Sequence, residues 1–224
     1  MMTSYLDILI QIRKLLIDYS IKKNIQFHSV DKKYKRTLKL SDDYEIYELE
    51  KITLDGEEGF QYHGITYVNV KTWISYKDGI RIADLDTLSI DKLGVCVKFK
   101  NGDRIPIEIV IHTFLHELAH TVTIPEQRIS KTINKLTKKL QSHITIKKKN
   151  AFMPCHHSDN FYRNFATILR MAEQLDIYIL PKTHRIFKIK NLQRYDCMFN
   201  PDDKLSVGTS LLYKDIKNEC ANRV

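Results

Sequence analysis

The stretch Ile107-Glu-Ile-Val-Ile-His-Thr-Phe-Leu-His-Glu-Leu-Ala-His-Thr121 carries the strongest structural signal of the chain. Its apolar side chains recur at steps of three and four residues, which predicts a helix with a buried face. The stretch contains His116-Glu117-Leu-Ala-His120, with its two histidines four residues apart. Residues at this spacing lie one above the other on a helix, so both imidazoles can reach one metal ion. H-E-x-x-H on a helix is the pattern of zinc hydrolases.

Two further roles complete such a site. Glu117 directly follows the first histidine, where it can accept a proton from an attacking water. A catalytic zinc takes three protein ligands, and Met153-Pro-Cys-His-His-Ser-Asp-Asn-Phe-Tyr162 offers two more histidines before another helix pattern, with Ser158 as its N-cap. We predict His157 as the third ligand because it precedes a helix whose apolar face must pack in the core. His156 is the alternative.

Four neighbouring residues have weaker claims to a role. Tyr162 is a candidate donor to the oxyanion of the reaction, although a packed tyrosine is the more common case. His112 lies one turn before His116 and fits a supporting position better than a ligand position. Cys155 is an alternative fourth ligand but more often an ordinary buried thiol. Glu173 is a less favoured ligand because it lies far along the third helix pattern.

The surrounding sequence predicts an α+β fold, in which a small antiparallel sheet packs on the H-E-x-x-H helix and on further helices. Short β-branched and aromatic runs occur at Ile65–Val70, Trp73–Tyr76, Ile80–Ala83 and Val95–Phe99. Asn101-Gly102 predicts a two-residue hairpin turn directly before the motif helix. Amphipathic helix patterns cover residues 3–23, 129–140 and 161–175.

Charge favours a polyanionic partner. The 224 residues include 36 basic and 27 acidic side chains, a net charge of +9, while 43% hydrophobic residues are enough for a core. No acidic residue occurs from Gln127 to Ser158, where we predict a basic helix ending in a lysine triplet; a solvated face is the equally weighted alternative. The predicted DNA contacts are Lys131, Lys135, Lys138, Lys139, Lys147, Lys148 and Lys149.

The remaining features predict an intracellular protein that is not secreted and has no membrane partner. Its four cysteines form no C-x-x-C pair, as in a reducing compartment. No apolar run approaches the ~18 residues of a membrane span, and charges interrupt the N-terminal helix pattern. We predict a charged helical extension at residues 1–59, a catalytic domain at 60–180 with a basic insertion at 126–150, and a C-terminal extension at 181–224 that includes strand-like alternation at Ile186–Ile189.

Two motifs together resemble a known family. Thr113-Phe-Leu-His-Glu-Leu-Ala-His120, followed by His157-Ser-Asp-Asn-Phe-Tyr162 and a helix, is similar to the Wss1-like (WLM) metalloproteases, relatives of the SprT-like group. The similarity covers roughly residues 95–180. The sequence departs from the family pattern in the long basic stretch between the motifs and in the serine between His157 and Asp159.

The resemblance implies a zincin-like fold with zinc held by His116, His120 and His157. It also implies a DNA-dependent protease that acts on proteins crosslinked to DNA, as in DNA repair, and similar domains occur in large DNA viruses. The metzincin pattern is disfavoured because its H-x-x-G-x-x-H continuation is missing after His120.

Three functions are compatible with these residues. A zinc metalloendopeptidase that hydrolyses DNA-associated proteins is preferred. The first alternative is a non-enzymatic, zinc-containing nucleic-acid-binding protein, and the second is a zinc hydrolase with another substrate. Glu117 favours an enzyme, because a structural zinc site has no use for a carboxylate that binds no metal; a fourth ligand such as Cys155 or His156 would indicate a structural site.

Overall fold

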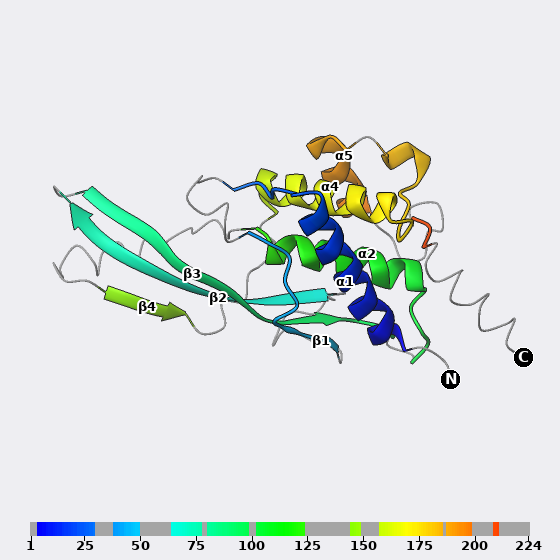
Figure 1. Ribbon diagram of the computed structural model, residues 1–224, viewed down its shortest axis with the longest axis horizontal. Coiled ribbons are helices and arrows are strands. Elements are labelled where there is room, and N and C mark those ends of the chain that lie inside the picture. The colour runs from blue at the N-terminus through cyan, green and yellow to red at the C-terminus, as the bar shows by residue number, and fades with distance from the viewer. Residues whose placement is uncertain are drawn as a thin grey trace, which may run out of the picture.

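Helices and one mixed β-sheet form the part of the chain that the computed structural model describes (Figure 1). The described residues are 4–29, 38–49, 64–77, 80–98, 102–123, 144–148, 157–185, 187–198 and 208–210. The helices are α1 (Tyr5–Lys22), α2 (Ile107–Thr121), α4 (Asp159–Gln174), the 3-10 helix η2 (Lys182–His184) and α5 (Ile189–Met198). The strands are β1 (Glu45–Glu48), β2 (Gly64–Lys77), β3 (Ile80–Val95) and β4 (Ile144–Lys148).

The sheet has the strand order β1-β3-β2-β4. Strand β2 pairs antiparallel with β3 and β4, whereas β1 lies parallel to β3. The prediction of a wholly antiparallel sheet is therefore wrong, because β1 comes from the acidic segment, which shows no strand pattern, and pairs parallel with β3. Strands β2 and β3 are 14 and 16 residues long. The runs predicted at 65–70 and 73–76 are one strand, and a register shift at Lys71/Thr72 coincides with the interruption between them.

The chain reverses direction before α2, as predicted, but by a longer turn. Gly102 has φ +87°, which a side chain rarely adopts. Lys98 forms an antiparallel bridge with Arg104, and the Ile105 N–H donates to the Val97 carbonyl at 3.0 Å. This pairing leaves residues 99–103 between the bridged positions, so the two-residue hairpin is wrong although the reversal is confirmed.

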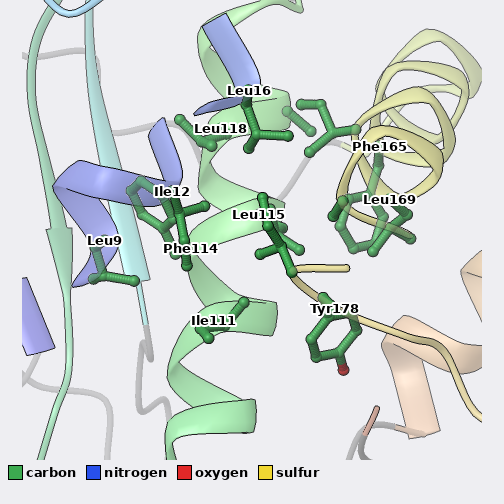
Figure 2. Close-up of a cluster of buried hydrophobic side chains, with 14 of the residues drawn as sticks. Leu9, Ile12, Leu16, Ile111, Phe114, Leu115, Leu118, Phe165, Leu169 and Tyr178 are labelled. Carbon is green, nitrogen blue, oxygen red and sulfur yellow. The ribbon is translucent and has the colours of Figure 1, made fainter. Parts of the chain in front are cut away.

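Helix α2 packs between α1 and α4. Figure 2 shows Leu9, Ile12 and Leu16 of α1 and Phe165 and Leu169 of α4 around the apolar side chains of α2. The ribbon formed by β2 and β3 begins beside α2 and extends away from the helices in Figure 1. The predicted helices at 3–23, along the H-E-x-x-H stretch and after Ser158 are thereby confirmed.

Two segments differ from their predicted structure. Residues 144–148 form strand β4, so the lysines there do not end a helix; β-branched residues at 144–146 favour the strand. Ile189 begins helix α5, so the strand-like alternation predicted at 186–189 is wrong where the structure describes it. The predicted helix at 129–140 lies outside the described residues. No helix among the described residues is long and apolar enough to cross a membrane.

Asn164 of α4 connects the end of α2 with the segment after α1. Its side chain is fully buried and accepts from the His28 N–H at 2.6 Å. Its amide also donates to the carbonyls of His28 and Val122 and to the Thr123 hydroxyl, at 2.9–3.1 Å. One side chain thus satisfies the buried Val122 carbonyl and two partly buried backbone groups of His28, next to the turn of α2 that carries His120.

We expect Asn164→Leu to lower the free energy of unfolding by about 2–4 kcal/mol, because it leaves the buried Val122 carbonyl and the partly buried His28 N–H and carbonyl without this partner. Urea unfolding of the full chain measures the change. Gln174→Leu, at an exposed position of the same helix, is the control. Equal small losses in both variants would contradict the connecting role of Asn164.

Candidate metal centre

The predicted metal ligands on helix α2 are among the few residues of this helix that are not buried. Of the residues from Ile107 to Thr121, only Glu108, His116 and His120 keep partial exposure. The two histidines lie one turn apart, and their ring centroids are 5.1 Å apart. The packing of α2 on its other sides therefore directs both imidazoles toward the same place.

His157 completes a group of three histidines. It precedes Ser158, whose hydroxyl accepts from the Phe161 N–H at 3.3 Å and caps helix α4. The ring centroid of His157 lies 4.6 Å from that of His116 and 5.2 Å from that of His120. One nitrogen of each ring lies within 4.8 Å of the others, so the three residues could hold a metal ion.

A carboxylate that the sequence analysis did not identify lies next to the histidines. Asp196 Oδ1 is 3.1 Å from His116 Nδ1, and the Tyr162 hydroxyl donates to Asp196 Oδ2 at 3.3 Å. The same hydroxyl is 3.2 Å from His157 Nδ1. Asp196 belongs to α5, whose buried Leu192 and Tyr195 lie on the same helix face. The predicted C-terminal extension thus contributes to the site.

These contacts indicate which ring nitrogens are available to a metal. His116 donates from Nδ1 to the Asp196 carboxylate. Because the Tyr162 hydroxyl donates its proton to Asp196, it accepts from Nδ1–H of His157. Both rings then carry their lone pair on Nε2, the arrangement by which second-sphere carboxylates and hydroxyls orient metal-binding histidines.

Burial and charge set the protonation states of the site. Burial, reinforced by His116 and His157, holds the pKa of His120 well below its usual range, so this ring is neutral. Burial alone would raise the pKa of Asp196, but His116 and His112 outweigh it and hold the pKa well below its usual range. For His116, burial lowers the pKa, but Asp196 outweighs it and the net change is upward. Three imidazoles, oriented by an ionised carboxylate, are a donor set that fits zinc.

Glu117 lies beside this group and is held by the first residues of β2. Its buried carboxylate accepts from the Thr66 hydroxyl at 2.6 Å. Gly64 allows this close approach, because a Cβ there would stand 2.6 Å from Glu117 Cγ and 2.8 Å from Thr113 Cγ2. Burial raises the pKa of Glu117, although His116 and Thr66 oppose the change. A carboxylate with a raised pKa is a more effective proton acceptor near neutral pH.

We expect Thr66→Val to lower the rate of hydrolysis, in which Glu117 is the predicted proton acceptor, about three- to tenfold. The reason is the loss of one hydrogen bond worth about 1 kcal/mol or slightly more. Valine has the same shape, so the metal content should not change. Thr66→Ser keeps the hydroxyl and should restore most of the rate. Equal rates in the valine and serine variants would contradict the positioning role.

The structure also places three of the weaker candidates. His112 is buried and its Nε2 is 3.9 Å from Asp196 Oδ1, so it supports the site rather than joining the three histidines. The Tyr162 hydroxyl contacts His157 and Asp196, which favours a supporting role over oxyanion binding. Glu173 lies 3.8 Å from the Arg185 guanidinium and is not part of the group.

The other predicted residues are not brought into the site by the described structure. Cys155, His156 and the predicted DNA contacts Lys131, Lys135, Lys138, Lys139 and Lys149 lie outside the described residues. Lys147 and Lys148 lie on β4, paired with Lys71 and Val70 of β2. Asp196 could have been suspected only from the apolar pattern of α5, because its contact with His116 spans 80 residues of sequence.

Comparisons with known proteins gave no further evidence on these residues. No family model, no curated protein and no solved structure matches the chain. The resemblance to the Wss1-like metalloproteases therefore stays a prediction that rests on the two motifs. The functional interpretation depends on the geometry of the histidines, Glu117 and Asp196.

Proposed function

We propose that the protein is a zinc-dependent metalloendopeptidase with a zincin-like fold, similar to the Wss1-like and SprT-like proteases. The observation that carries the proposal is the convergence of His116, His120 and His157 next to the buried carboxylate of Glu117. Three histidines and an adjacent carboxylate are the parts that metal-assisted hydrolysis requires. Asp196 orients two of the ligands, as expected for a site that is built to keep its metal.

In this proposal each residue has a defined task. His116, His120 and His157 hold the ion, which supplies Lewis-acid polarisation of the scissile carbonyl and lowers the pKa of water when bound. Glu117 accepts the proton of the attacking water on its carboxylate and passes it to the leaving amine. Thr66 keeps this carboxylate in place between the two transfers.

Strand β2 provides a place for an extended substrate. Among the described residues, β4 pairs only with Val70–Ile74, so the second edge of β2 from Gly64 to Asn69 has no strand beside it. A peptide can add to such an edge through main-chain hydrogen bonds. Because Gly64 and Thr66 contact Glu117, a peptide on this edge would lie near the metal position. This arrangement supports a peptide substrate.

The proposed substrates are proteins bound or crosslinked to DNA, in the manner of DNA–protein crosslink repair. The net charge of +9 supports a nucleic-acid partner. The basic stretch from Gln127 to Ser158, which contains no acidic residue, also supports a nucleic-acid partner through the predicted lysine contacts.

The test is a cleavage assay on the full chain loaded with zinc. Self-cleavage and cleavage of a DNA-bound protein are followed with and without single-stranded DNA, and with a chelator added. We expect DNA-stimulated cleavage that the chelator stops, that added zinc restores and that His120→Ala lacks. If the zinc-loaded chain binds DNA but cleaves nothing, it is a non-enzymatic nucleic-acid-binding protein and the proposal is wrong.

A further inference from the structure

A basic groove lies between helix α4 and the start of helix α5, outside the metal centre. The two helices pack side by side (Figure 1), and the groove has a volume of about 560 Å³. Helix α4 contributes Arg163 and Arg170, which are seven residues apart and therefore about 10 Å apart along the helix. The segment that enters α5 contributes Lys188 and Lys190. All four side chains are exposed.

Among the described residues, no acidic side chain neutralises the charge of this groove. None of the described acidic residues lines it, and none forms an ion pair with any of the four basic residues. The nearby Glu173 lies instead 3.8 Å from Arg185. Four like charges around one concave surface attract an anion with several charged groups.

The groove also presents a flat surface suited to a base. The Arg170 guanidinium lies over the Phe187 ring, 4.8 Å from its centroid. Phe187 is half-buried and packs against the core. Stacking on arginine and aromatic planes, combined with a positive groove for the backbone, is how single-stranded nucleic acids are bound without regard to sequence.

We propose that this groove binds single-stranded nucleic acid, with phosphates on Arg163, Lys188 and Lys190 and a base against the Arg170–Phe187 pair. An acidic peptide would satisfy the charges but would not use the stacking surface, so the nucleic acid is favoured. The surface consists of residues other than the lysines predicted at 131–149. The inference does not depend on peptide hydrolysis. Tyr162 lines the groove, and its hydroxyl contacts His157 and Asp196, so the strand would lie beside the metal centre.

The test measures binding of a fluorescent oligothymidine to the full chain by anisotropy at several salt concentrations. The groove variant combines Arg163→Gln, Arg170→Gln, Lys188→Gln and Lys190→Gln. The control variant combines Lys14→Gln, Lys22→Gln, Lys23→Gln and Lys39→Gln, which removes the same charge from exposed positions elsewhere. We expect the groove variant to bind about tenfold more weakly. The slope of log K against log salt should fall in magnitude by roughly two, since three phosphate contacts are lost and each contributes ~0.7 on a single strand. The control should change less than about twofold.

Each alternative gives a different result. Equal losses in both variants would overturn the proposal, because net charge alone would then explain binding. Unchanged binding in the groove variant would assign the nucleic acid to another surface. Binding of duplex DNA, or competition by polyglutamate, at the strength of the oligothymidine would exclude a single-strand site. His120→Ala and Glu117→Gln should bind the strand like wild type, so a failed cleavage assay would leave this inference intact.

Discussion

Glu117→Gln is expected to lower the rate of peptide hydrolysis about 10²- to 10⁴-fold, the contribution of a general acid–base residue. Glutamine has the same size and can still accept the hydrogen bond of Thr66 through its amide oxygen. It cannot accept the proton of the attacking water. Because Glu117 is buried and is not a ligand in the three-histidine group, the metal content and the fold should not change.

The measurement is the initial rate of cleavage of a DNA-bound protein, with the zinc content of each preparation determined in parallel. Glu108→Gln is the matched control, because it changes the same residue type in the first turn of the same helix. The control should retain the wild-type rate. Equal activity of Glu117→Gln and wild type, at equal zinc content, would show that Glu117 is not the proton acceptor and that the proposed mechanism is wrong.

The parts of the fold that depend on local pattern could be predicted from the sequence. Helix α2 is predicted by its apolar periodicity, and Ser158 is predicted as the cap of α4 by its residue type and position. His116 and His120 are one turn apart in any helix, so their juxtaposition needs no tertiary information. The sequence favours His157 over His156 because His157 precedes a helix whose apolar face must pack in the core, and the structure places it in the histidine group.

The parts that depend on long-range packing could not be predicted. Strand β1 pairs parallel with β3, and a four-residue segment of the acidic region carries no signal for that partner. Tyr195 hydrogen-bonds Tyr178 at 3.0 Å, and Leu192 is fully buried, so α5 is packed against the hydrophobic core. This packing brings Asp196 to the histidines. Glu117 and Thr66 are 51 residues apart, and their contact requires that β2 cross α2 beside Gly64. Sequence identifies ligands on one helix, but their supporting residues come from other elements.

Asp196→Asn is expected to weaken zinc binding about 10- to 100-fold, the usual loss when a partner of a ligating histidine is changed. The asparagine occupies the same space but carries no negative charge, so it no longer makes Nε2 of His116 a more basic ligand. Its amide can also present N–H groups where the Tyr162 hydroxyl and His116 now meet a carboxylate. We therefore expect lower zinc affinity, although Asp196 itself is not a metal ligand.

A merely structural role for Asp196 would give a different pattern, which two measurements separate. Competition with a chromophoric chelator gives the zinc affinity, and thermal unfolding of the metal-free chain at pH 8 gives its stability. Because His116 and His112 hold the pKa of Asp196 below its usual range, the ionised carboxylate stabilises the metal-free fold at this pH, and the metal-free variant should lose some stability in addition to its loss of zinc affinity. Glu173→Gln, which removes the same charge at a surface ion pair, should change neither quantity. Lower stability with unchanged zinc affinity would show that Asp196 holds α5 in place rather than orienting the metal ligands.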